Sequence, residues 1–217
     1  RSLSQVEMKD SKIEWIGEIP EHWGVVRMKY ISDVVRGAIL RPVDEPLYFD
    51  ENGEWTYLNI SDVTKIYKYL DFGVLRLSEL GSTKSRKIEP SNLIITGSGS
   101  VGKVFINTIP VCVHDGFIPL LNLKADINFM FYYLVNPNLY EAIGKTNSQK
   151  NIYLDEVKDL FVTLPPLPEQ QAIVAYLDEQ TALIDKSIAV ESQKIEKLKE
   201  YRQSLISAVV TGKICII

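Results

Sequence analysis

A periodic apolar pattern over the last fifth of the chain predicts one long, uninterrupted helix. It follows a proline-rich segment at residues 164–168, and from Leu177 its apolar residues recur in steps of 7, 4, 7, 3, 7 and 4. Splitting each step of 7 into 3 and 4 gives a mean spacing of about 3.56, between a coiled-coil seam and an ordinary amphipathic face. The apolar positions after Leu177 are Ile184, Ile188, Ile195, Leu198, Leu205 and Val209. Residues 169–211 would span roughly 64 Å at ~1.5 Å per residue. A single helix of that length cannot fold back on its own globule, so we expect a spacer, a rod that binds a partner, or both.

The bulk composition allows one sizeable hydrophobic core plus such an extension. The chain has 217 residues, of which 46% are hydrophobic and 24% charged, as in an ordinary globular protein. No apolar run approaches the ~18 residues of a membrane span and there is no signal-peptide pattern, so we expect a cytosolic protein without a membrane partner. Cys112 and Cys215, with His22 and His114, are too few for a disulfide framework or a Cys/His zinc site. We therefore expect no metal.

Charge is distributed unevenly along the chain. The formal net charge is −4, yet residues 63–103 carry seven basic and three acidic side chains, a net of +4. This stretch includes the basic run at residues 84–87. A local basic patch is what contact with phosphate requires, whatever the charge of the whole chain. The same run also fits an ordinary solvated loop, so charge alone does not decide the function.

Short apolar segments before the long helix predict strands bounded by Gly, Pro, Asn and Ser. These segments are residues 25–31, 56–60, 92–96, 104–107, 111–114 and 119–123. A helix is expected over 127–140, near the helix-ending pair Asn136-Pro137. A short helix over 154–160 and a last strand over 161–164 follow. Without regular βαβ alternation, the pattern predicts an α+β domain over residues 12–165, followed by the long helix in residues 166–214.

A glycine-rich segment resembles a nucleotide-binding loop but fails its structural requirement. Residues 97–103 match G-x-G-x-x-G and lie one residue short of a phosphate-binding loop, because Val104 stands where Ser or Thr would hold Mg²⁺. Both loops need a helix directly after the glycines. Here the continuation, residues 104–107, is strand-like, which favours a tight strand–turn–strand. Binding of Mg-nucleotide that depended on Lys103 would revive the enzyme hypothesis.

Two further motifs suggest catalysis only weakly. Cys112 and His114 would share one face of a strand, but their apolar setting favours a buried, inert thiol. The segment at residues 136–140 resembles the Asn-Pro-Pro-aromatic motif of amino-methyltransferases without its second proline, and no loop for S-adenosylmethionine precedes it. The sequence therefore predicts no catalytic residue in this chain.

An ordered set of segments resembles the specificity subunits of type I restriction–modification systems, and it covers nearly the whole chain. The matching segments are residues 15–23 (Trp-Ile-Gly-Glu-Ile-Pro-Glu-His-Trp), 97–102, 149–152, 164–173 (Leu-Pro-Pro-Leu-Pro-Glu-Gln-Gln-Ala-Ile) and 205–214. Subunits of this family carry two target-recognition domains, each followed by a long helix, and together read the halves of an interrupted DNA site. This chain holds one such domain, so it is either a natural half-length form or part of a longer protein.

The resemblance implies an assembly. Methyl transfer and cleavage would reside in modification and restriction subunits, which would carry S-adenosylmethionine, ATP and Mg, while this chain would need no cofactor. Its long helix would pair as an antiparallel coiled coil with a second half-subunit and form a docking rod for the modification subunit. A homodimer predicts identical, inverted half-sites on double-stranded DNA; a heteromer with a different half-subunit predicts an asymmetric target.

Three exposed polar segments supply the donors that reading of DNA requires. Their candidate contact residues are Arg36 and Arg41; Lys84, Arg86 and Lys87; and Lys145, Asn147, Gln149 and Lys150. The six apolar positions of the long helix are the candidate dimer contacts. The competing hypothesis is a coiled-coil scaffold whose globular head binds protein. Strong salt dependence of binding would favour DNA, because phosphate contacts weaken steeply as salt rises.

Overall fold

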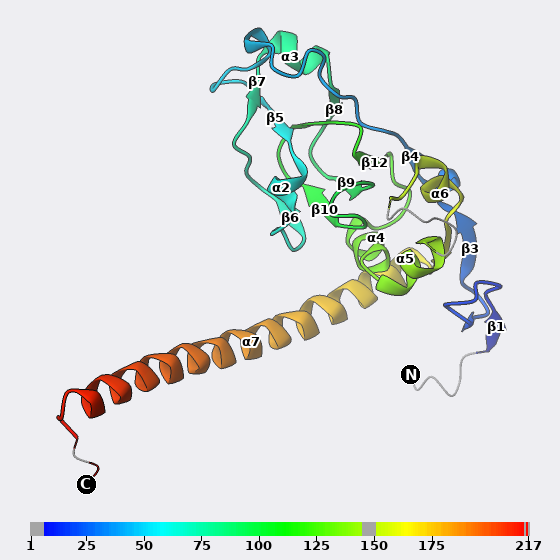
Figure 1. Cartoon of the computed structure of the whole chain (residues 1–217). Helices are drawn as coiled ribbons and strands as arrows, with labels where there is room; N and C mark the ends of the chain where they lie inside the picture. Colours follow the sequence, from blue (N-terminus) through cyan, green and yellow to red (C-terminus); the bar gives the residue numbers. More distant parts are fainter. Residues whose placement is uncertain (1–6, 145–150, 215, 217) are drawn as a thin grey trace. The chain divides into compact units, whose positions relative to one another are not determined.

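The structure, a computed structural model, describes residues 7–144, 151–214 and 216. The chain divides into two compact units, Arg1–Gln171 and Ala172–Ile217. The first is a mixed unit of strands and short helices, and the second is almost entirely helical (Figure 1). The predicted combination of an α+β domain and a long C-terminal helix is confirmed.

The first unit is built from short elements. Its strands are β1 (Met8–Asp10), β2 (Glu18–Pro20), β3 (Gly24–Arg27), β4 (Asp33–Val34), β5 (Trp55–Leu58), β6 (Tyr69–Leu70), β7 (Arg76–Leu77), β8 (Arg86–Ile88), β9 (Asn92–Thr96), β10 (Val104–Asn107), β11 (Val111–Val113), β12 (Phe117–Leu121) and β13 (Phe161–Leu164). Its helices are α1 (Met28–Ile31), the 3-10 turn η2 (Pro46–Tyr48), α2 (Ile60–Val63), α3 (Glu79–Thr83), α4 (Ile127–Leu134), α5 (Pro137–Gly144) and α6 (Leu154–Asp159). The long helix α7 is Leu167–Val210.

Two sheets form the body of this unit. One has the strand order β4-β12-β9-β10-β6 and the other has the order β7-β5-β11-β8. Most neighbours are antiparallel, while β10 and β6, and β11 and β5, run parallel. Two smaller pairs, β1 with β2 and β13 with β3, complete the pairing.

The alternation of side chains along β9 explains why the first sheet is buried on both faces. Leu93 and Ile95 belong to one apolar cluster, together with Met130 and Phe131 of α4. Ile94 belongs to a second cluster on the other face, which also holds side chains of β11 in the second sheet. Successive side chains of a strand point to opposite faces. The unit is therefore layered as helices, sheet and sheet, with a core in each space between layers.

The strand predictions on either side of the glycine-rich turn match the structure residue for residue. The segments 92–96 and 104–107 are strands β9 and β10, paired as an antiparallel hairpin. The expectation that glycines 97–102 form a strand–turn–strand is thereby confirmed, and no helix follows them. Gly99 and Gly102 have φ of +73° and +78°, which glycine adopts without strain.

Two strand predictions ran into the helix that follows, and the strand expected over 119–123 lies two residues earlier, as β12. The strand expected over 25–31 ends at Arg27, because Met28 and Ile31 bury their side chains at helical spacing in α1. The strand expected over 56–60 ends at Leu58, because Asn59 begins α2 with a capping box that it forms with Asp62. In both cases one helical turn follows the strand directly.

The single helix expected over 127–140 is also wrong, since the segment forms two helices. α4 begins at the cap residue Asp126, whose carboxylate accepts from the backbone N–H groups of Asn128 and Phe129. It ends at Leu134, and α5 begins at Pro137. Proline disfavours helical backbone in the residue before it but suits the first position of a helix.

The first turn of α7 belongs to the globular unit and is held there by side chains. Glu169 accepts a hydrogen bond from the indole Nε1 of Trp23 (2.9 Å), and its other oxygen lies 2.7 Å from His22 Nε2. Gln170 is buried; its Oε1 accepts from the backbone N–H of Asp126 (2.8 Å) and its Nε2 donates to the carbonyl of Pro165 (2.8 Å). Two segments distant in sequence, 15–23 and 164–173, thus meet at this helix start.

Residues 182–207 of α7 are all exposed. The helix has 44 residues, and its only buried residue is Gln170. It is followed by Gly212, with φ of +72°. None of the helices in the described segments combines the length and apolar character needed to cross a bilayer.

Candidate nucleic-acid interface

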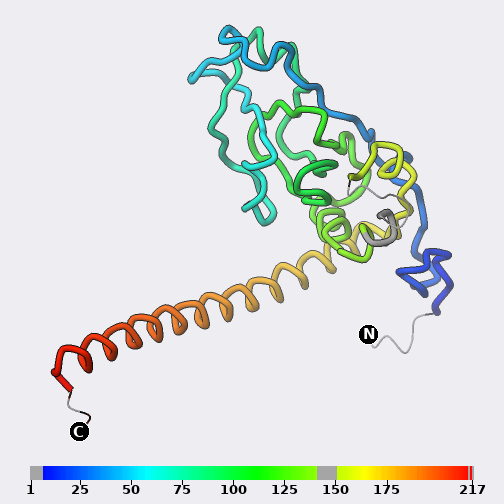
Figure 2. The backbone as a smooth tube through the Cα atoms, viewed as in Figure 1, coloured from blue at the N-terminus to red at the C-terminus, as the bar shows by residue number. Residues whose placement is uncertain are grey.

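The extended segment around Arg36 is fixed to the two sheets by its backbone. The N–H of Val35 donates to the carbonyl of Pro119 (3.0 Å), that of Gly37 to Phe117 (3.1 Å), and that of Ala38 to Val113 (2.9 Å). Figure 2 shows this segment running beyond β4 as extended chain. A Cβ on Gly37 would lie 1.9 Å from the carbonyl oxygen of His114, so only glycine permits this approach. The position of Arg36 is therefore set by the sheets.

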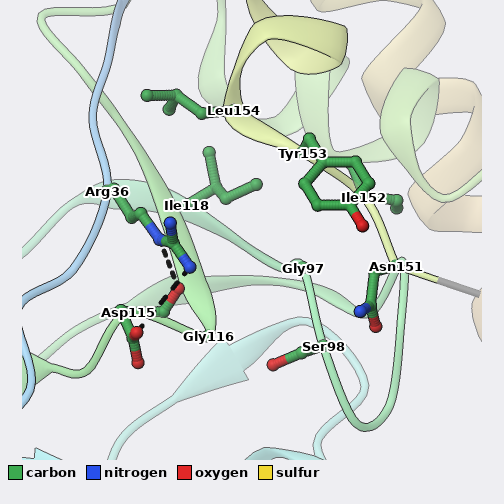
Figure 3. A pocket seen from close by; sticks show the side chains of 10 residues that line it. All are labelled: Arg36, Gly97, Ser98, Asp115, Gly116, Ile118, Asn151, Ile152, Tyr153 and Leu154. Carbon is green, nitrogen blue, oxygen red and sulfur yellow. Dashed lines mark hydrogen bonds and ion pairs between the residues drawn. The ribbon is translucent and has the colours of Figure 1, made fainter.

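The side chain of Arg36 is oriented by Asp115 in the turn between β11 and β12. Its Nε donates to the Asp115 carbonyl oxygen (3.0 Å), and its Nη2 lies 3.7 Å from Asp115 Oδ2. The two side chains are 63% and 47% exposed, so the pair is accessible to a ligand (Figure 3). We call these two residues the Arg36–Asp115 pair.

The structure brings the second predicted segment beside the first. Ser85 donates through its hydroxyl to the carbonyl of Ala38 (2.9 Å), and Arg86 Nε donates to the carbonyl of Arg36 (3.2 Å). Lys84 is exposed immediately before them. Two segments separated by almost fifty residues thus present their cations together.

Arg41 and Lys87 are exposed but occupy different surroundings. The carbonyl of Arg41 accepts from the hydroxyl of Tyr48 (3.2 Å). Lys87 follows Arg86 on β8 and therefore points to the opposite face of the sheet, where its Nζ lies 4.8 Å from the centroid of the Trp55 ring. The structure does not join Lys87 to the Arg36–Asp115 pair, and its contact with DNA stays a prediction.

The third predicted segment falls mostly outside the described residues. Lys145, Asn147, Gln149 and Lys150 lie there. The chain resumes at Asn151, and Ile152 N–H donates to the carbonyl of Gly97 (2.9 Å).

A cavity with mixed polar and apolar lining lies beside the first segment and the start of residues 151–154. It has a volume of about 130 Å³ and is bordered by the Arg36–Asp115 pair, by Gly97 and Ser98 of the β9–β10 turn, and by residues 151–154 (Figure 3). Sequence reasoning did not single out Ser98 or Asp115 as contact residues. The local sequence of each carries no signal that Arg36 lies nearby.

The residues that suggested nucleophilic catalysis are not poised for it. Burial raises the pKa of Cys112 to about 12, and nearby Lys87 opposes this only in part, so the thiol stays protonated near neutral pH. Burial lowers the pKa of His114, whose Nδ1 accepts from the backbone N–H of Gly116 (3.0 Å). The predicted buried thiol is confirmed. Across the described ranges, no three His, Cys, Asp or Glu residues gather as a potential metal site.

The predicted dimer contacts form an exposed stripe on α7. Ile184, Ile188, Ile195, Leu198 and Leu205 are 41–65% exposed, and Val209 is half-buried. Large apolar side chains in water are unfavourable when they form a continuous stripe, and such stripes mark interaction surfaces.

The comparison with known protein families covers both units. Residues 20–200 match the family described as the type I restriction modification DNA specificity domain. The chain belongs to this family. The resemblance noted from the sequence is thereby confirmed, and DNA recognition is favoured over a protein-binding scaffold.

Curated relatives of this chain are about twice its length. It is 26% identical over 217 residues to the putative type I restriction enzyme MjaX specificity subunit of Methanocaldococcus jannaschii, covering 96% of this chain and 47% of that protein. It is 25% identical to the EcoKI specificity subunit of Escherichia coli K12, covering 91% and 44%. The chain therefore spans about half the length of the curated relatives it matches.

Solved structures show the same fold. A chain from a study of complex assembly and conformational transition of the type I restriction–modification system matches with a TM-score of 0.72 at 19% identity, covering 88% of this chain and 46% of that one. The HsdS subunit from Thermoanaerobacter tengcongensis matches with a TM-score of 0.66 at 18% identity, covering 90% and 46%. At these identities the likeness shows that the specificity subunit fold is shared.

Proposed function

We propose that this specificity domain reads one half of a bipartite DNA target for a type I restriction–modification complex. The observation that carries the proposal is the family match over residues 20–200, which includes both the globular unit and most of α7. The globular unit, residues 12–165, would be the target-recognition domain, and residues 166–214 would be the spacer. Since its target is DNA, the chain would act in the cytosol.

The cations around Arg36 and Arg86 support this role for the globular unit. They belong to separate segments that the fold places together on an exposed surface with donors suited to bases and phosphates. The undescribed residues 145–150 directly precede Asn151 at the same cavity. In the proposal, Lys145, Asn147, Gln149 and Lys150 contact the same DNA, and Arg41, Lys84 and Lys87 contribute at the periphery.

The exposed stripe of α7 supports pairing with a second half-subunit. Two copies related by a two-fold axis would place the same stripe on both sides of the contact, which makes antiparallel pairing self-complementary. Two identical recognition domains would then read inverted half-sites. Pairing with a different half-subunit would instead give an asymmetric target.

A second apolar stripe on α7 supports a further partner. Tyr176, Leu183, Val190 and Tyr201 are exposed and recur in steps of 7, 7 and 11 residues. At ~100° per residue they lie roughly 100° around the helix from the first stripe. A helix with two such stripes can pack against two neighbours, and we assign the second to the modification subunit. The restriction subunit would join through that complex.

This division of labour leaves the chain without catalytic residues of its own. Methyl transfer and cleavage would belong to the partner subunits, together with S-adenosylmethionine, ATP and Mg. Two observations support this division. The Cys112 thiol is protonated and so a poor nucleophile, and a strand follows the glycine turn where a nucleotide-binding loop would need a helix.

The test is to combine the chain with a cognate modification subunit and S-adenosylmethionine on genomic DNA, and then to map the methylated bases. A two-part motif with inverted repeat halves is expected for the homodimer. An asymmetric two-part motif would keep the recognition role and require a different second half. No methylation, with a modification subunit shown to be competent, would overturn the proposal.

A further inference from the structure

We propose that Arg36 reads a guanine in the recognised half-site and that Asp115 positions it to do so. This inference rests on the proposed function and goes further by assigning one base of the target to one residue. It begins from the Arg36–Asp115 pair and the cavity that the pair borders (Figure 3).

The contacts of Arg36 leave one edge of its guanidinium available. Nε and Nη2 face Asp115, at 3.0 Å from its carbonyl oxygen and 3.7 Å from its carboxylate. A guanidinium carries five N–H donors in a rigid plane, so the donors on its far edge remain directed outward. That edge has the geometry that pairs with two neighbouring acceptors, and guanine offers O6 and N7 side by side in the major groove.

The charge of the cavity favours a base over a phosphate. Among the described residues that line the cavity, Arg36 and Asp115 are the two charged ones, so the lining is formally neutral. A phosphate entering there would meet an anion as well as a cation, whereas the neutral edge of a base meets a directed donor without that repulsion.

The backbone of Arg36 is fixed, as base reading requires. Residues on both sides of it are hydrogen-bonded to the sheets, through the N–H groups of Val35 and Gly37, and its own carbonyl accepts from Arg86. A side chain that is held in position before binding loses less conformational freedom when it binds. Ser98 and Asn151, on two other segments, border the same cavity and offer a hydroxyl and an amide to neighbouring atoms.

The test uses the full chain assembled with its modification subunit and short duplexes in which each base pair of the mapped target is replaced in turn. Arg36→Lys keeps the positive charge but removes the paired donors. We expect discrimination at one guanine to fall roughly 10- to 100-fold, while the salt dependence of binding stays unchanged.

Arg27→Lys is the matched control. Arg27 is also an arginine paired with an aspartate, at 3.0 Å from Asp159, and its side chain is 40% exposed, but it lies on β3 and does not border the cavity. It should leave discrimination unchanged at every position. Asp115→Asn leaves the backbone carbonyl that accepts from Arg36 Nε and removes only the carboxylate charge 3.7 Å from Nη2. It should therefore reduce discrimination at the same guanine as Arg36→Lys, by a smaller factor.

Three results would overturn the inference without touching the proposed function: a recognised half-site that contains no guanine, unchanged discrimination in Arg36→Lys, or Asp115→Asn acting at a different base pair. Failure of the wild-type complex to methylate any bipartite target would instead count against the proposed function itself. Thermal unfolding of each variant checks that a change in reading is not a loss of fold.

Discussion

In the globular unit Phe105, Phe117 and Phe131 are fully buried, whereas Ile188, Ile195 and Leu198 of α7 are each more than half exposed. The first unit satisfies its apolar residues internally, between layers of sheet and helix. The second displays them in stripes along a helix whose residues 182–207 are all exposed. In the proposed assembly the second unit covers its apolar surface against a partner, so stability and assembly should be separable by mutation.

The largest expected effect is on assembly, in Leu198→Asp. A two-fold pair contains this residue twice, and each buried leucine contributes about 1.5–3 kcal/mol, so we expect the pair to weaken by about 3–6 kcal/mol and its Kd to rise at least 100-fold. Sedimentation equilibrium measures the change.

Gln193→Asp is the control for that substitution, because residue 193 lies on the opposite side of the helix from the apolar stripe. It introduces the same charge and should leave the mass of the assembly unchanged. Equal dissociation by both variants would contradict a seam through Leu198.

The next effect is on the globular unit, in Phe105→Ala. Phe105 is fully buried and packs edge-to-face on Phe117, with ring centroids 6.2 Å apart. Its truncation should lower the free energy of unfolding by about 3–5 kcal/mol, as measured by urea denaturation, without changing the association of α7. Phe72→Ala, at a 64% exposed residue, should stay within ~0.5 kcal/mol of the wild type.

A smaller effect is expected where the two units join, in Gln170→Ala. The substitution leaves the part-buried N–H of Asp126 and the buried carbonyl of Pro165 without their partner. Each lost partner costs ~1–3 kcal/mol, and the part-buried N–H lies at the low end of that range, so we expect a destabilisation of about 2–4 kcal/mol in urea. The adjacent Gln171 is exposed, and Gln171→Ala is the matched control. Equal destabilisation by Gln170→Ala and Gln171→Ala would contradict the conclusion that the hydrogen bonds of Gln170 hold the first turn of α7.

The smallest effect concerns pH. Hydrogen bonds from Trp23 and then from His22 lower the pKa of Glu169 below its ordinary value of 4.5. A lowered pKa contributes stability above the ordinary value, and that stability is lost as pH falls through the lowered pKa. Trp23→Phe removes the largest cause, so its Tm should fall less steeply than that of the wild type as pH drops below about 4.5. If the Tm of Trp23→Phe and that of the wild type fall in parallel with pH, protonation of Glu169 does not affect the stability of the fold.

The features predicted best are those that neighbouring residues determine. The repeat of apolar residues specified α7 to within a few residues, and the glycines between two β-rich segments specified the β9–β10 hairpin. The predictions failed where one helical turn follows a strand without a break, at Met28 and Ile60, and where Pro137 both ends one helix and begins another. Such boundaries depend on which side chains the neighbouring layers bury.

Within the candidate interface, the sequence by itself identified Arg36 and Arg86 as basic residues on projecting segments. Only the tertiary structure placed them side by side, oriented Arg36 through Asp115, and brought Ser98 and Asn151 to the same cavity. It also separated Lys87 from its neighbour Arg86, since consecutive residues of a strand face opposite ways. Periodicity along a chain records which faces are apolar. The contacts of Arg36 with Arg86 and Asp115, and the cavity that it shares with Ser98 and Asn151, join segments far apart in the sequence, which no local pattern encodes.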